Sequence, residues 1–163
     1  MELMNSQFNH TLLELGQRSV THEATAEAGP RAKLEVNVVF TNRRGTLAAL
    51  ETAGKLAHNL GARINLVVAQ AVPYSLSLDR PPVSIPFIEQ RLLELAGQGA
   101  QGPLETKVQV YLCRASRQAL LQVLKPKSLV ILGGRARWWP TKEGRLARML
   151  CSKGHQVVFA HVK

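Results

Sequence analysis

The sequence predicts a single α/β domain built on a doubly wound, five-stranded parallel sheet. Short apolar, β-branched segments alternate with segments of helical periodicity from Leu34 to the end of the chain. Such alternation is typical of βαβ units, whose right-handed crossovers cover both faces of a parallel sheet. The length of 163 residues suits one such domain. The clearest stretch is Ser128–Val162, which runs from a buried strand through a glycine turn and a basic loop to a helix and a last strand.

Each element follows from its own pattern. Strands are predicted where apolar and β-branched residues run together or alternate, and helices where apolar residues recur at helical spacing. Thr46 is the predicted N-cap of the first helix and Gly61 its C′ residue. The predicted strands are Leu34–Phe40, Ala62–Val72, Glu105–Leu112, Ser128–Leu132 and Gln156–Val162. The predicted helices run from Thr46 to about Leu60, Phe87–Ala96, Ser116–Leu124 and Lys142–Cys151.

Residues 1–33 differ from the rest and predict an N-terminal arm, flexible or packed on a partner, in front of a domain over 34–163. The arm ends in a small, polar stretch closed by Gly29 and Pro30, which is typical of a linker. The chain start lacks a basic segment followed by an apolar one, and no apolar run reaches the about 18 residues of a membrane helix. We therefore expect a cytoplasmic protein without a membrane partner, in which Cys113 and Cys151 are buried free thiols.

Basic residues are concentrated in the second half of the chain. Lys and Arg number 9 against 10 Asp and Glu up to Glu105, but 12 against 1 from Thr106 onward, and the net charge is +10. A positive field on one half of a molecule favours an anionic partner, such as a phosphate-bearing small molecule, an acidic protein or nucleic acid. Improved solubility alone explains the same charge equally well.

Two stretches resemble the universal stress protein family. The first is VVFTNRRGTLAALETAGKLAHNLGARINLVV, in which Ala49, Leu50, Ala53 and Ala57 match the helix spacing of the family. The second is SLVILGGRARWWPTKEGRLARML followed by CSKGHQVVFAHV, which matches the order strand, glycine motif, helix and last strand. The resemblance implies a Rossmann-like fold with strand order 3-2-1-4-5, and a homodimer paired through the C-terminal strand.

The resemblance also implies a ligand crevice where the first and fourth predicted strands end, at the point where the strand order reverses. Many family members hold ATP there, with the triphosphate on the glycine loop and the following helix N-terminus. In this chain the candidate ligand- or phosphate-binding residues are Thr41, Asn42, Arg43, Gly133, Gly134, Arg135, Arg137, Lys142, Gly144 and Arg145, with Trp138 and Trp139 as candidate stacking residues.

Several of these positions depart from the family motif. Thr41 stands where ATP-binding members have Asp, and Asn42 stands in place of the next Gly. Gly133 matches the first motif glycine, but the second falls on Ala136, which resists close backbone approach to phosphate. The third falls on Leu146, or on Gly144 with Arg145 after it if the loop is shorter. Loss of standard ATP binding is therefore favoured.

Two interpretations of the altered loop stay open. Either the nucleotide site is lost, or a phosphate ligand remains and is held by Arg135, Arg137 and Lys142 at the helix N-terminus. Trp138 and Trp139 could stack on a base or contact a partner. Alternatively, one indole covers the sheet end and the other is partly exposed. Arg145 and Arg148 share a helix face and could add to a nucleic-acid-binding patch, although a solvated face is commoner.

Enzyme chemistry finds little support in the sequence. There is no GxSxG or HExxH motif and no histidine pair at metal-ligand spacing, and surface positions are expected for the histidines. No carboxylate is predicted in the crevice. Cys113, followed by Arg114 and Arg117, is the one nucleophile to test, because the arginines could lower its pKa.

The expected function is that of a non-catalytic, stress-associated regulatory binding protein. It would have a degenerate nucleotide motif and a basic crevice for an anionic ligand or acidic partner, without a resident cofactor. The alternatives are a universal stress protein that binds ATP or another nucleotide through an altered phosphate loop, and a nucleic-acid-binding accessory protein.

Overall fold

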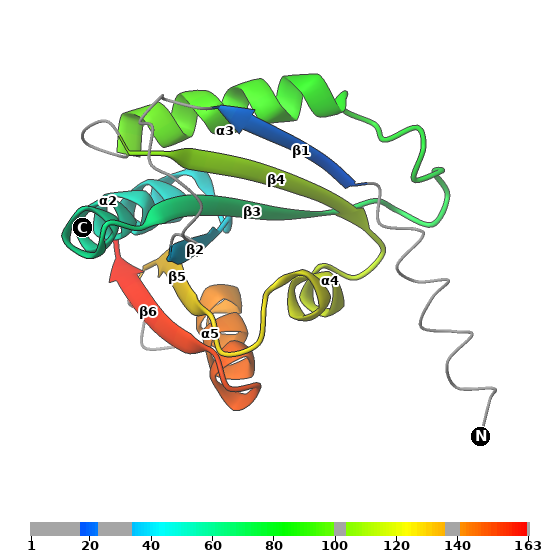
Figure 1. Ribbon diagram of the computed structural model, residues 1–163. Coiled ribbons are helices and arrows are strands. Elements are labelled where there is room, and N and C mark those ends of the chain that lie inside the picture. Colours follow the sequence, from blue (N-terminus) through cyan, green and yellow to red (C-terminus); the bar gives the residue numbers. More distant parts are fainter. Residues whose placement is uncertain (1–16, 23–33, 100–103, 136–140, 163) are drawn as a thin grey trace.

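A computed structural model of the chain describes residues 17–22, 34–99, 104–135 and 141–162. Within these residues the strands form one sheet in the order β1-β4-β3-β2-β5-β6, with helices packed on both faces (Figure 1). The parallel strands are β2 (Glu35–Val39), β3 (Arg63–Ala71), β4 (Thr106–Cys113), β5 (Leu129–Gly134) and β6 (Gln156–His161). The predicted doubly wound sheet and its strand order 3-2-1-4-5 are confirmed.

The sixth strand, β1 (Gln17–His22), was not predicted from the sequence. It runs antiparallel to β4, with Gln17 opposite Tyr111 and His22 opposite Thr106. Part of the stretch assigned to the N-terminal arm therefore extends the sheet, while the domain boundary after residue 33 stays a prediction. As a consequence, β4 has a neighbour on both sides, and β6 is the strand at the opposite edge of the sheet.

Four helices in the described part of the chain cover the sheet. Helices α2 (Arg43–Leu60) and α3 (Ile85–Gly99) pack over one face, where Leu50, Ile64 and Leu92 belong to one apolar core. Helices α4 (Ser116–Val123) and α5 (Lys142–Ser152) pack over the other face, where Leu120 and Leu150 belong to a second core. No helix in the described part of the chain has the length and apolar character needed to cross a bilayer.

The start of α2 differs from the prediction. Asn42, not Thr46, is the N-cap, because its side chain accepts a hydrogen bond from the Gly45 N–H over 2.9 Å. The residues Arg43–Gly45, which precede the predicted helix, form its first turn. Thr46 is buried inside it, and its hydroxyl accepts from the Thr41 N–H over 3.2 Å. The predicted C′ role of Gly61 is confirmed by its left-handed backbone, with a φ of 60°.

Glu35, the first residue of β2, is bound by two cations. Arg63 Nε donates to Glu35 Oε1 over 2.9 Å, and Lys125 Nζ donates to Oε2 over 3.2 Å. Burial is the largest single influence on this carboxyl group and raises its pKa. The hydrogen bonds and charges of Arg63 and Lys125 together outweigh burial and hold the pKa below its ordinary value of 4.5.

Glu35→Gln is expected to lower the free energy of unfolding by about 1–3 kcal/mol at neutral pH, because hydrogen bonds to a charged group are lost. A folded-state pKa below the unfolded one stabilises the fold above the unfolded pKa, and this stabilisation is lost as pH falls through the folded pKa. The difference between wild type and variant should therefore shrink below pH 4.5. Urea unfolding across a pH series measures it, with the exposed Glu51→Gln as control. A difference that grows in acid would contradict this account.

Candidate functional site

The carboxyl ends of β2 and β5 meet directly, as the sequence predicts for the first and fourth strands. Thr41 Oγ1 donates a hydrogen bond to the Gly133 carbonyl oxygen over 2.8 Å. The first turn of α2 packs closely against the same carbonyl group. A Cβ atom added to Gly45 would lie only 2.4 Å from Gly133 O, so no side chain fits between them. In the reverse direction, a Cβ on Gly133 would be 1.7 Å from Gly45 O. The end of β5 therefore lies with its backbone against the backbone of the first turn of α2, and the segment after β2 is joined to it through the Thr41 side chain.

A second link crosses the crevice beside this contact. Asn42 Nδ2 donates to Glu143 Oε1 over 3.3 Å, which joins the end of β2 to the first turn of α5. Thr141 caps α5, and its hydroxyl accepts from the Gly144 N–H over 3.1 Å. The crevice thus contains a carboxylate that was not predicted there. Glu143 places negative charge at the helix N-terminus, where a bound phosphate would otherwise be favoured.

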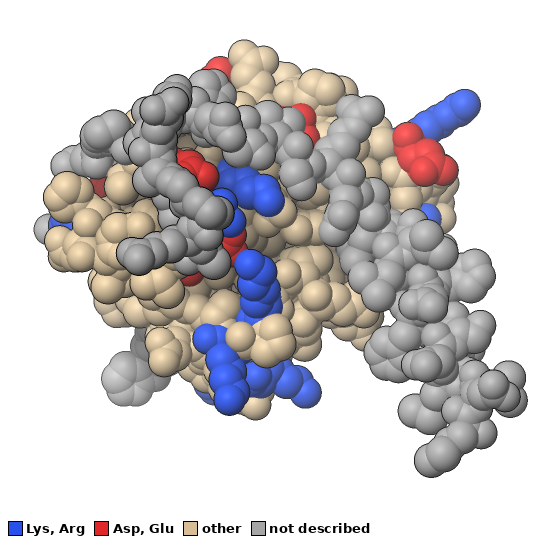
Figure 2. All heavy atoms as spheres, in the orientation of Figure 1, with Lys and Arg blue, Asp and Glu red and all other residues tan. Residues whose placement is uncertain are grey.

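The other predicted site residues take different positions. Gly134 is buried at the end of β5, while Arg135, Lys142 and Arg145 are exposed. Figure 2 shows Lys and Arg side chains gathered over the region in which Figure 1 places α5. Arg137, Trp138 and Trp139 lie outside the described residues. Binding of a phosphate by any residue of this set stays a prediction.

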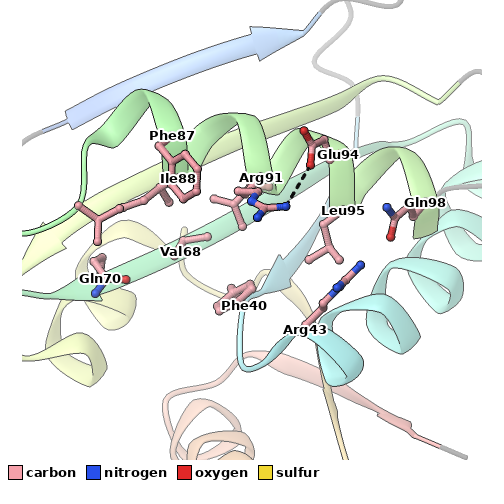
Figure 3. A pocket seen from close by; sticks show the side chains of 12 residues that line it. Phe40, Arg43, Val68, Gln70, Phe87, Ile88, Arg91, Glu94, Leu95 and Gln98 are labelled. Atoms are coloured by element: carbon pink, nitrogen blue, oxygen red, sulfur yellow. Dashed lines mark ion pairs between the residues drawn. The ribbon is translucent and has the colours of Figure 1, made fainter.

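A pocket of about 400 Å³ lies next to the crevice, between α3 and the ends of β2 and β3 (Figure 3). Its wall is mostly apolar, and its rim is polar. Phe40, at the end of β2, and Val68, on β3, face the inner side of α3. The apolar lining consists of Phe40, Val68, Val83, Phe87, Ile88, Leu92 and Leu95, and the polar lining of Arg43, Gln70, Arg91, Glu94 and Gln98.

Among the described residues, Arg43 is the cation of this pocket that has no counter-charge. Arg91 forms an ion pair with Glu94, with 3.7 Å between Nη1 and Oε2. Its guanidinium group also lies over the Phe87 ring, with the guanidinium carbon 5.4 Å from the ring centroid. In the described part of the chain no carboxylate lies within ion-pair distance of Arg43. Its side chain extends from the start of α2 toward Leu95 and Gln98 (Figure 3). The pocket therefore combines an apolar wall with one uncompensated positive charge.

The sequence does not reveal this pocket, apart from Arg43. The apolar residues of α3 have ordinary helical spacing, which predicts core positions for all of them. Leu92 and Leu95 are buried as expected, but Phe87 is 52% exposed, and Val83, in the loop before α3, is 44% exposed. These exposed apolar side chains lie at the mouth of the pocket. Their exposure depends on how α3 packs on the sheet, which the sequence pattern does not give.

Cys113 is not an activated thiol, so the hypothesis that neighbouring arginines lower its pKa is wrong. Burial raises the pKa of the Cys113 thiol, and the hydrogen bond with Ser116 only partly opposes this. Arg114 instead donates to backbone carbonyl oxygens, at 3.1 Å for Val72 and 2.9 Å for Leu76. Cys151 is exposed, contrary to the prediction of two buried thiols.

The histidine prediction is also partly wrong. His155 is buried, and its Nδ1 is hydrogen-bonded to the Ser128 hydroxyl over 3.0 Å. His161 is exposed, as expected. Among the described residues no group of three or more His, Cys, Asp or Glu side chains could hold a metal ion.

Comparison with solved structures places the fold among the universal stress proteins. A universal stress protein in complex with cAMP matches with a TM-score of 0.55 and 18% sequence identity, over 82% of this chain and 100% of that chain. A universal stress protein from Archaeoglobus fulgidus matches with a TM-score of 0.52 and 12% identity, over 78% of this chain and 98% of that chain. No protein-family model and no curated protein sequence matches this chain. The chain has the universal stress protein fold.

Proposed function

We propose that this chain is a non-catalytic binding protein for a nucleotide-like ligand with one negative charge, held in the pocket beside α3. One observation carries the proposal: the uncompensated Arg43 faces an apolar pocket, while the adjacent strand ends are joined by the bond from Thr41 to Gly133. The solved universal stress protein in complex with cAMP supports the choice of ligand class. A cyclic nucleotide has a flat base and a single charged phosphate.

The charges beside the pocket favour one phosphate over three. Arg43 can form charge-assisted hydrogen bonds to a phosphate oxygen, which are stronger than neutral ones. Arg91 is already paired with Glu94. A longer phosphate chain directed toward the crevice would approach Glu143, whose carboxylate repels it. The expected preference is therefore cAMP over ATP.

The pocket walls suit an aromatic ring. A volume of about 400 Å³ lies within the range of small-molecule sites, which are mainly apolar with a few polar groups for orientation. Phe40 and Phe87 offer ring faces, and Gln70 and Gln98 offer amide groups for a base edge. This combination is favourable for adenine and less so for a simple inorganic anion.

We further propose a homodimer paired through β6, together with the stress-associated regulatory role that the resemblance implies. In the described part of the chain β6 has β5 on one side and no strand on the other. An open edge of this kind can pair with the same strand of a second copy.

Thermal unfolding with added nucleotides tests the proposal. A ligand that binds only the folded state stabilises it by about 2.7 kcal/mol at a hundredfold excess over Kd. We expect a clear rise in Tm with cAMP and a smaller rise with ATP at equal concentration, with adenosine as the uncharged control. Equal Tm values for all three at millimolar concentration, or a larger rise with ATP, would contradict the proposal.

A further inference from the structure

The face of the sheet covered by α4 and α5 carries a nearly unmixed positive charge. From Thr106 onward the chain has 12 Lys and Arg but a single acid, Glu143, which bonds to Asn42 in the crevice. Exposed Lys and Arg residues lie on both helices and in the segments next to their ends. They are Arg117 on α4, Lys125 and Lys127 after it, Arg135 after β5, Lys142, Arg145 and Arg148 on α5, and Lys153 after it. We call these residues the basic face.

The α5 part of the basic face forms a row. Lys142, Arg145 and Arg148 are three residues apart, so successive side chains share a helix surface and are about 4.5 Å apart along its axis. In the described part of the chain none of the three lies within ion-pair distance of a carboxylate, whereas Lys125 is paired with Glu35. The row is free to neutralise an external chain of negative charges.

In the described part of the chain, the basic face has no large exposed hydrophobic side chain of the kind that other anionic partners need. Every large exposed hydrophobic side chain in the described residues precedes α4, and none lies on α4 or α5. These are Leu34, Leu60, Tyr74, Leu76, Val83 and Phe87. Stable protein interfaces have an apolar, aromatic-rich centre, and helices that lie on membranes insert an apolar face. The described residues of the basic face therefore favour a partner that carries many negative charges, since its exposed groups are mainly cations.

We propose that the basic face binds the phosphate backbone of nucleic acid without reading bases. Phosphate contacts by Lys and Arg supply this kind of binding and are independent of sequence. The proposal does not rest on the ligand pocket, which lies on the side of α2 and α3. The two proposals can therefore fail separately.

Fluorescence anisotropy with a labelled random-sequence DNA duplex, and with the matching single strand, tests the proposal. We expect a Kd of about 10⁻⁴ to 10⁻⁶ M near physiological salt. With about four phosphate contacts, affinity for the duplex should fall about 100-fold between about 50 and about 200 mM salt. The single strand should show a shallower salt dependence, because its charge density is lower.

The double variant Arg145→Gln/Arg148→Gln should weaken binding at least tenfold at low salt and reduce the salt slope by about 2. Lys55→Gln/Arg80→Gln is the matched control, since it removes the same charge from exposed positions on α2 and in the loop before α3. Thermal unfolding of both variants checks that the fold is intact. Three results would overturn the proposal: no complex at low salt, equal weakening by both variants, or binding to phosphatidylserine vesicles without binding to either DNA.

Discussion

Gly133→Ala should destabilise the fold by at least about 3 kcal/mol, through overpacking that the structure cannot relieve. The new Cβ would lie 1.7 Å from Gly45 O and 2.4 Å from Gly45 C. Both atoms belong to the backbone of the first turn of α2, and the new Cβ is fixed in β5, so no side chain can rotate away. Relief requires moving α2 off the sheet, and this would also break the bond from Thr41 to Gly133. Urea unfolding followed by circular dichroism measures the loss.

Gly97→Ala is the matched control, because a Cβ at Gly97 on α3 would meet no atom within 4 Å. Alanine is the better helix former, so this variant should be more stable than wild type by about 0.5–1 kcal/mol. Wild-type stability of Gly133→Ala would show that the end of β5 and the first turn of α2 are not in backbone contact. The account of the crevice would then be wrong.

The parallel strands could be predicted because burial on both faces leaves a simple signature, whereas their order was implied by the resemblance to universal stress proteins. Central strands of a parallel sheet are continuous apolar runs, and Glu35–Val39 lies within the predicted Leu34–Phe40. β1 leaves no such signature. In QRSVTH only Val20 is apolar, so the strand depends on pairing with β4, which is distant in sequence. Stabilisation by pairing with a strand that is distant in sequence cannot be predicted from the local pattern of residues.

The helix start was predicted at the wrong residue for a local reason. Asn42 and Thr46 are both good N-caps, and Gly45 between them is typical of a turn. The contact between Gly45 and Gly133 explains why the helix starts earlier. Position 45 has to be a glycine because its backbone lies against Gly133, and it is nevertheless part of α2. The glycine is required for packing rather than for a turn.

The candidate site was predictable only as a location. The rule for open α/β sheets brings Thr41 next to Gly133, and the hydrogen bond between them confirms this. It does not say whether the space is open, because that depends on side chains such as Glu143 reaching across from α5. Nor can spacing separate the residues of α3 that line a pocket from those that fill the core.

Arg43→Met should weaken cAMP binding by about 10- to 100-fold, since a hydrogen bond to a charged group contributes about 1.5–3 kcal/mol. Methionine keeps much of the side-chain length and removes the charge. Arg44→Met removes a charge from the exposed neighbouring position, which does not line the pocket. It should leave the affinity within about twofold of wild type, because exposed charges contribute little. Isothermal calorimetry of the three proteins measures the ratios.

The position of the ligand is the most direct test of where this chain binds small molecules. Nuclear magnetic resonance of isotope-labelled protein titrated with cAMP measures it, through the methyl groups of Val68, Leu92 and Leu95 and the amide groups of Gly133 and Gly134. The account predicts that the methyl signals shift with a saturable dependence on cAMP, and that both glycine signals stay in place. If the signals of Gly133 and Gly134 shift while the methyl signals stay in place, the ligand binds in the crevice, and the account is contradicted.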